Sequence, residues 1–141
     1  METTMKKSKK KRIIVIAALV IFVPLLAFGG SYLYTVARYQ QIVSDTVIVT
    51  PDLQAVKDGT YLGEYDAIMV SAEVSVTVKD GEITDVVLVR HKTDRGVPAE
   101  RITQDALAAQ SLEVDTITGA TNSSKVILKA IENALNAGIS A

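Results

Sequence analysis

The sequence predicts a single N-terminal transmembrane helix followed by a small α+β domain, in which an antiparallel β-hairpin or sheet packs against two helices. Three observations predict this fold class. Residues 13–37 carry no charge, residues 69–91 alternate apolar and polar side chains around an Asp-Gly turn, and two later segments place apolar residues at helical spacing. Strands followed by helices in a chain of 141 residues indicate one α+β domain behind an anchor.

The predicted anchor is the run IIVIAALVIFVPLLAFGGSYLYTVA at residues 13–37. At 1.5 Å per residue, its 25 residues are long enough to cross a bilayer. Residues 1–12 contain six Lys and Arg, so the positive-inside rule makes them a cytoplasmic basic segment and places the rest of the chain outside the cytoplasm. The competing interpretation is a cleavable signal peptide, but the apolar region of such a peptide is shorter, about 7–15 residues.

The charge and the cysteine content of the external part exclude several classes of partner, catalysis and cofactor. Residues 38–141 hold nine Lys and Arg against fifteen Asp and Glu, a net charge of about −6, which argues against nucleic acid as a partner. The chain has no cysteine, which excludes disulfides, thiolate catalysis, thiolate-bound iron–sulfur clusters and c-type haem. Redox chemistry here would therefore need another cofactor.

Residues 38–56 have mixed polar composition and include Pro51, so we interpret them as a stalk, and residues 57–141 as the folded domain. Thr60 to Tyr65 has the composition of a short strand. From Met69 to Val78 apolar and polar residues alternate with a period of two, and a turn with Asp80-Gly81 leads into the apolar, β-branched run Ile83 to His91. This pattern predicts a β-hairpin.

Two helices complete the predicted domain. Ala99 to Gln110 has Ile102, Ala106 and Ala109 along one side. The closing helix, from about Ser123 to Asn136, has a continuous apolar face, formed by Val126, Ile127, Ala130, Ile131, Ala134 and Leu135.

The loop before the closing helix, DTITGATNSS at residues 115–124, has two readings. In the first, Thr121, Asn122 or Ser123 caps the helix, and Gly119 permits a backbone conformation barred to other residues. In the second, the helix N-terminus binds a phosphate through its free N–H groups and the helix dipole, and a hydroxyl placed there bears a phosphate ester.

The segment Asp115-Thr-Ile-Thr-Gly-Ala-Thr121 resembles the D-x-x-(S/T)-G-A-T flavinylation motif of the FMN-binding domain family, which includes flavin-carrying subunits of Rnf complexes and of sodium-translocating NADH:quinone oxidoreductases. Short motifs recur by chance. Here the resemblance also covers the opening strand, the hairpin and the closing helix, from about Lys57 to Leu135.

The resemblance implies that a flavin transferase uses FAD to attach FMN through its phosphate to Thr121. It further implies that Gly119 and Ala120 keep the loop slim and that Thr118, Asn122 and Ser123 donate to the phosphate. Ser123 and Ser124 are alternative esterification sites. For Asp115, holding the loop shape and being read by the transferase are both open.

Three other residues are weaker candidates for flavin contacts. His91, the single histidine, resembles a family position near the isoalloxazine ring, and a surface histidine is the alternative. Tyr61 and Tyr65 are of a type that stacks on a flavin ring, although packing of the first strand is the favoured interpretation.

The expected function is a membrane-anchored extracytoplasmic flavoprotein that carries electrons through covalent FMN, with redox proteins in the membrane or outside the cell as partners. Two alternatives remain: a flavin reductase acting directly on a small substrate, and a flavin-free extracellular interaction module. No metal site is expected.

Overall fold

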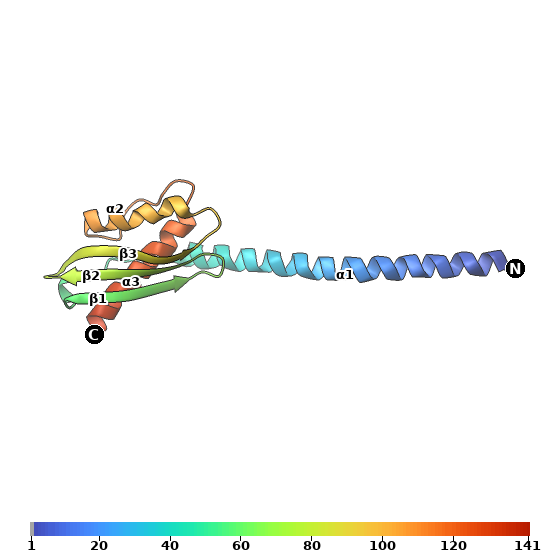
Figure 1. The fold of residues 1–141 in the computed structure, drawn as a ribbon, viewed down its shortest axis with the longest axis horizontal. Helices are drawn as coiled ribbons and strands as arrows, with labels where there is room; N and C mark the ends of the chain where they lie inside the picture. The colour runs from blue at the N-terminus through green and yellow to red at the C-terminus, as the bar shows by residue number, and fades with distance from the viewer. Residues whose placement is uncertain (1) are drawn as a thin grey trace. The chain divides into compact units, whose positions relative to one another are not determined.

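A computed structural model describes residues 2–141, and the side chains from residue 9 onward. The chain divides into two compact units, Met1–Arg38 and Tyr39–Ala141. Residues 2–38 of the first unit belong to α1, which runs as one helix over Glu2–Asp45 with Pro24 inside it. The second unit holds the sheet, the other helices and the last turns of α1 (Figure 1).

The helix α1 carries the predicted anchor. Its apolar side chains from Ile13 to Tyr34 are largely exposed, and none of its most apolar stretch is buried within the protein. By length and composition it can cross a membrane, over Lys9–Asp45. The helix extends beyond both ends of the predicted run at residues 13–37, because neither the basic flank nor the polar residues after Ala37 include a helix-breaking proline.

The sheet has three antiparallel strands in the order β1-β2-β3, with bounds Gly59–Asp66, Ser71–Lys79 and Glu82–Lys92. The predicted hairpin is β2–β3. Asp80 and Gly81 have positive φ angles of 52° and 75°, which is the backbone that a two-residue hairpin turn needs. On β2 the alternation predicted from the sequence is present, with Ala72, Val74, Val76 and Val78 buried.

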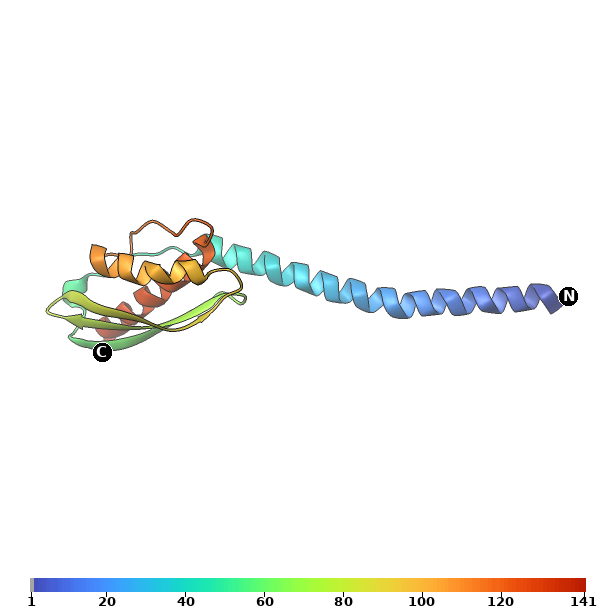
Figure 2. The same cartoon turned by 45° about the horizontal axis from the view of Figure 1, so that its top comes forward.

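The closing helix α3, Thr121–Ser140, crosses one face of the sheet (Figure 2). All six residues of its predicted apolar face are buried. At Gly63 the strand β1 passes so close to α3 that an added Cβ would lie 2.5 Å from the amide nitrogen of Ala134. The sheet and α3 therefore form one core, and the predicted α+β fold class is confirmed.

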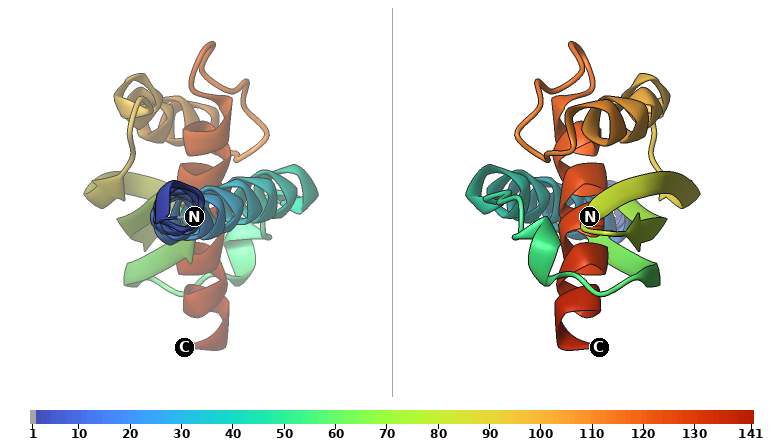
Figure 3. Two further views of the ribbon diagram at one scale, coloured as in Figure 1. Left: turned by 90° about the vertical axis from the view of Figure 1, so that its right-hand side faces the viewer. Right: turned by 90° about the vertical axis from the view of Figure 1, so that its left-hand side faces the viewer.

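The remaining helix, α2, is Ile102–Ala109, preceded by a short 3₁₀ helix at Val97–Arg101. Ile102 and Ala106 are buried as predicted, but Ala109 is exposed, because the helix ends there and Gln110 takes a left-handed conformation. Figure 3 shows the loop after α2 returning to the N-terminal end of α3. This return places the DTITGATNSS segment at one end of the domain.

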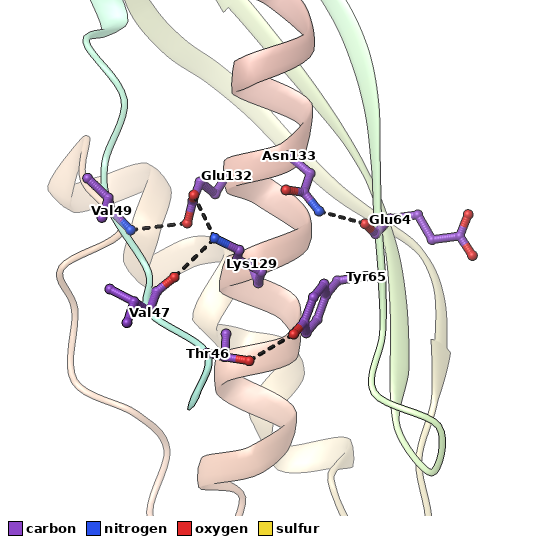
Figure 4. Close-up of polar contacts among 8 residues, drawn as sticks. All are labelled: Thr46, Val47, Val49, Glu64, Tyr65, Lys129, Glu132 and Asn133. Atoms are coloured by element: carbon purple, nitrogen blue, oxygen red, sulfur yellow. Dashed lines mark hydrogen bonds and ion pairs between the residues drawn. The ribbon is translucent and has the colours of Figure 1, made fainter. Parts of the chain in front are cut away.

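Residues 39–56, expected to form a stalk, pack on the domain and belong to its compact unit. Val43 and Val56 are buried, and Tyr39, Ile42, Ile48 and Leu53 pack against the same core. Polar contacts hold the extended part of the segment to α3 and β1 (Figure 4). These are Lys129 Nζ to Val47 O (3.0 Å), Val49 N to Glu132 Oε2 (3.1 Å) and Thr46 Oγ1 to Tyr65 OH (2.8 Å). Within α3, Lys129 Nζ also pairs with Glu132 Oε1 (2.7 Å). The composition of the segment was polar enough to suggest a stalk, but its spaced apolar residues reach the core.

We expect this packing to set the smallest stable domain. A fragment of residues 39–141 should unfold cooperatively in urea, whereas a fragment of residues 57–141 should have lost most of its near-UV circular dichroism. The shorter fragment lacks Val43 and Val56, and burying an aliphatic side chain of this kind contributes about 1.5–3 kcal/mol. Equal urea midpoints for the two fragments would contradict this expectation.

Candidate functional site

Thr121 is the first residue of α3, and no side chain caps this helix. The residue at the capping position is Ala120, which has no hydrogen-bonding side chain, so the expectation that Thr121, Asn122 or Ser123 caps the helix is wrong. Thr121, Asn122 and Ser123 are instead the first three residues of the helix, one to three positions after the capping position. The positive end of α3 is consequently open to an anion.

The hydroxyl groups at the start of α3 differ in exposure. Thr121 is exposed, whereas the side chains of Ser123 and Ser124 belong to residues only 3% and 0% exposed. Ser124 Oγ donates to Ala120 O (2.9 Å) and accepts from Ile117 N (3.0 Å), which ties the loop to the helix. Of these three hydroxyls, only that of Thr121 can be reached by a large molecule.

A cleft of about 490 Å³ opens beside Thr121. Four segments line it: the last part of α1, the β1–β2 turn, the loop after β3, and the start of α3. The lining residues are Tyr39, Met69, Val70, Thr93, Asp94, Arg95, Gly96, Gly119, Ala120, Thr121, Asn122 and Ser123. Its size falls within the range of about 300–1,000 Å³ that small-molecule and cofactor sites occupy.

The loop after β3 is fitted closely to α3. Gly96 N donates to Thr93 Oγ1 (2.8 Å), and Thr93 Oγ1 shares a hydrogen bond with Ser123 Oγ (3.2 Å). A Cβ on Gly96 would lie 2.6 Å from the Cβ of Ser123. Ser123 is therefore part of the wall that joins the two loops, and its hydroxyl is already engaged.

One positively charged side chain, that of Arg95, lines the cleft, and it is 92% exposed. Its contact with the carboxylate of Asp94, at 3.7 Å, is also exposed and therefore weak. A guanidinium group matches the geometry of phosphate oxygens. Arg95 and the N-terminus of α3 thus make this cleft suited to a phosphate group.

The loop before Thr121 has the open backbone that the sequence predicted. Gly119 has a φ of +79°, and a Cβ on it would meet nothing within 4 Å. Thr118 and Asp115 are exposed but do not line the cleft. Within the described residues, the Asp115 carboxylate accepts no hydrogen bond. The structure therefore brings Gly119, Ala120, Thr121, Asn122 and Ser123 together at the cleft and leaves Thr118 and Asp115 outside it.

Part of the cleft was missed by sequence reasoning. No residue from Thr93 to Gly96 was among the candidate site residues, although a polar, glycine-containing loop directly after a strand is a common place for binding residues. Tyr39 and Met69 gave no signal in the sequence, since they reach the cleft through packing between segments that are distant along the chain.

His91, Tyr61 and Tyr65 do not line the cleft. The His91 side chain is 2% exposed, its Nδ1 lies 3.1 Å from Glu100 Oε1, and its Nε2 is buried without a partner in the described part of the chain. It is therefore not a surface histidine, and it faces a different hollow between β3 and α2. Tyr61 OH donates to Lys57 O (2.9 Å) and Tyr65 OH pairs with Thr46, as expected of residues that pack the first strand.

The β1–β2 turn that carries Met69 into the cleft is strained. Ile68 has a φ of +74°, which is unfavourable for a β-branched residue. We expect Ile68→Gly to raise the free energy of unfolding by about 1 kcal/mol, because the strain of a non-glycine residue in this region is about 1–3 kcal/mol and Ile68 is exposed. Urea denaturation measures this change, and a loss of stability of that size would show that the Ile68 side chain matters more than its backbone.

Comparison with known proteins identifies the domain that contains the cleft. Residues 70–136, which include β2, β3, α2 and Thr121, match the family model described as FMN-binding domain. A curated relative, the NADH:acrylate oxidoreductase of Vibrio harveyi, is 41% identical over 66 residues, which cover 45% of this chain. The aligned part spans only 7% of that relative. Residues 70–136 of the chain are therefore an FMN-binding domain.

Proposed function

We propose that the protein is a membrane-anchored extracytoplasmic flavoprotein that carries electrons through one FMN, attached by a phosphoester to Thr121. The observation that carries this proposal is the position of Thr121. Its hydroxyl is the exposed one at the uncapped, positive end of α3, and it borders the cleft of a domain that matches an FMN-binding family.

The attachment is a transfer reaction at the Thr121 hydroxyl. Thr121 Oγ1 attacks the phosphorus of FAD nearest the flavin, the phosphoanhydride bond breaks, AMP leaves, and the hydroxyl proton is lost. A flavin transferase is the partner that catalyses this step. Among the described residues that line the cleft there is no histidine, and the carboxylate of Asp94 is 96% exposed, so we assign the base to the transferase.

The chain's own residues have distinct roles in this proposal. The first-turn amides of α3, with Asn122 and Arg95, hold the phosphate. Gly119 and Ala120 keep the loop narrow enough to enter the transferase, and Thr118 contacts the phosphate only if the loop moves, since it lies outside the cleft. The unengaged carboxylate of Asp115 favours recognition by the transferase over a role in holding the loop.

FMN supplies the redox chemistry when bound, and the protein supplies attachment, orientation and the electrostatic surroundings. Covalent attachment suits a domain outside the cytoplasm, where a dissociated cofactor would be diluted away. The basic segment at residues 1–12 supports this orientation. The negative charge of residues 38–141 would favour redox partners with basic docking surfaces.

A reductase acting directly on a small substrate is the second candidate, because the curated relative is named as an oxidoreductase of acrylate. This chain covers only 7% of that relative, so the activity in the relative's name is weak support for a reductase. The carrier function is therefore the better supported one. Turnover of acrylate with NADH by the purified, flavin-loaded chain would favour the reductase.

Co-expression of the full chain with and without a flavin transferase tests the proposal. We expect a gain in intact mass of one FMN less one water, and flavin absorbance that survives denaturation, only when the transferase is present. Protein that stays colourless and unmodified under both conditions would favour a flavin-free interaction module.

A further inference from the structure

The strand β3 lies at an edge of the sheet, because the strand order is β1-β2-β3. On its outer side, one residue already has a partner. The side-chain amide of Gln110 accepts a hydrogen bond from Ile83 N (2.8 Å) and donates one to Ile83 O (2.7 Å). These are the two hydrogen bonds that a residue of a neighbouring antiparallel strand would make. Gln110 therefore stands in for one residue of a fourth strand.

The register of β3 gives the other positions whose backbone groups point outward. Every second residue of β2 from Val78 to Val74 pairs with Ile83, Val86 or Leu88. Alternate residues of an antiparallel pair direct their N–H and C=O groups to the same side, so Val86 and Leu88 point outward as Ile83 does. Within the residues that the structure describes, no hydrogen bond reaches these outward groups of Val86 and Leu88. Beyond Gln110, the edge of β3 is thus open to another strand.

A groove of about 650 Å³ runs along this open edge. One wall is β3 from Asp85 to His91, and the other is formed by Glu100, Thr103 and Gln104 of the 3₁₀ helix and α2. Seven strand residues extend over about 23 Å, which is enough for a typical added strand of about five to six residues. The groove shares no lining residue with the cleft beside Thr121.

Both ends of the groove are tied. At one end Gln110, the C-cap of α2, is bonded to Ile83. At the other end His91 Nδ1 lies 3.1 Å from Glu100 Oε1, and the His91 side chain is buried. A peptide could therefore enter without ordering either wall, which lowers the cost of binding.

The side chains around the groove indicate which peptide fits it. The exposed Val87 and Val89 offer apolar contacts. The carboxylates of Asp85 and Glu100 line the groove, and the Arg90 guanidinium is already paired with a carboxylate of β2 at 2.8 Å. Residues 38–141 also carry a net charge of about −6. A strand with alternating basic and apolar residues complements these features.

We propose that the groove between β3 and α2 binds an extended basic segment of a partner protein, which adds to the sheet as a fourth strand antiparallel to β3. Main-chain hydrogen bonds to a sheet edge are an established mode of peptide recognition. Residues of the segment opposite Val86 and Leu88 direct their N–H groups to β3 and their side chains to the face of the sheet on which α2 lies (Figure 2). The residues between them lie beside Val87.

A methylated peptide tests the main-chain pairing. The probe is fluorescently labelled acetyl-Lys-Val-Lys-Val-Lys-Val-Lys amide, and fluorescence anisotropy measures its binding to the full chain in neutral detergent. In the proposed register the lysine N–H groups face β3. Methylation of two inner lysine amide nitrogens should therefore weaken binding about tenfold or more, and methylation of two valine amide nitrogens should change it by less than about threefold. An equal or reversed effect, or no binding of the unmethylated peptide, would overturn the proposal.

Gln104→Lys and Ala109→Lys form a matched pair that locates the binding. Both residues are exposed and lie on α2, but only Gln104 lines the groove. Gln104→Lys should weaken binding of the unmethylated peptide several-fold through charge repulsion, whereas Ala109→Lys should leave it nearly unchanged. Near-UV circular dichroism checks that both variants fold. Equal weakening in both folded variants would show a general effect of charge and overturn the assignment to the groove.

The rival occupant of the edge is a second copy of this chain. Self-pairing would bring together two domains of the same net charge, which disfavours it. Light scattering in detergent should therefore give the same mass for the wild type and for Val87→Lys, which places a charge on the exposed edge. A wild-type dimer that Val87→Lys dissociates would assign the edge to a second copy and overturn the proposal.

Discussion

Thr121→Ala should abolish covalent attachment of FMN, so that the variant co-expressed with a flavin transferase shows neither flavin absorbance after denaturation nor the mass of the ester. The physical reason is access: Thr121 is exposed, whereas Ser123 and Ser124 are buried and hydrogen-bonded. With Thr121 removed, no other hydroxyl in the first turn of α3 can reach FAD. Intact mass spectrometry of wild type and variant measures the effect.

Two control variants separate chemistry from folding. Thr121→Ser keeps a hydroxyl at the same place and should retain attachment. Ser124→Ala removes the hydrogen bond that Ser124 Oγ donates to Ala120 O and the one that it accepts from Ile117 N, so it should destabilise the loop by about 1–3 kcal/mol but leave Thr121, the FMN acceptor, in place. Full attachment in Thr121→Ala would move the ester to another hydroxyl, and loss of attachment in Thr121→Ser would show that the methyl group of Thr121 is also required.

Gly63→Ala should lower the free energy of unfolding by about 2–3 kcal/mol, the upper part of the range for overpacked cores. The added Cβ would meet the backbone oxygen of Ala130 and lie 2.5 Å from the amide nitrogen and 2.8 Å from the Cβ of Ala134. Backbone atoms within a helix cannot rotate away as a flexible side chain can, so β1 and α3 must separate. Urea unfolding of the detergent-solubilised chain, followed by near-UV circular dichroism of its tyrosines, measures the loss.

The matched control for this substitution is Glu64→Ala on the same strand. The Glu64 side chain is exposed, and its hydrogen bond with Asn133 uses the backbone oxygen, which alanine keeps. Its stability should change by no more than about 0.5 kcal/mol. Comparable losses in the two variants would show that the β1 strand as a whole, rather than the close approach at Gly63, is sensitive to substitution.

The fold was largely predictable because its elements have strong local signals. The alternation from Val70 to Val78 and the Asp80-Gly81 turn predict the hairpin, and the apolar face of α3 is continuous. The prediction that Ala109 belongs to the apolar side of the helix was wrong. The point at which a helix ends depends on its capping conformation, here at Gln110, more than on the spacing of apolar residues. The close approach at Gly63 was not predictable, since a glycine within a strand does not reveal what lies opposite.

Only one wall of the candidate site could be predicted from the sequence. The motif before α3 points to Thr121, which the structure places at the cleft, but the facing wall comes from Tyr39, Met69 and the loop after β3. These segments meet through tertiary packing, and nothing local in them marks a binding residue. The burial of His91 was likewise not predictable from the local sequence. It depends on tertiary packing, because Glu100, which His91 contacts, is placed there by the 3₁₀ helix Val97–Arg101.

The measurement that tests the central claim most directly is the location of the flavin on the chain itself. Trypsin should release residues 102–125 as one peptide, which contains Thr103, Ser111, Thr116, Thr118, Thr121, Ser123 and Ser124. Fragmentation mass spectrometry of this peptide, from chain co-expressed with a flavin transferase, should place the mass of one FMN less one water on Thr121. The same mass on any other residue, or its absence from the peptide, would contradict the account.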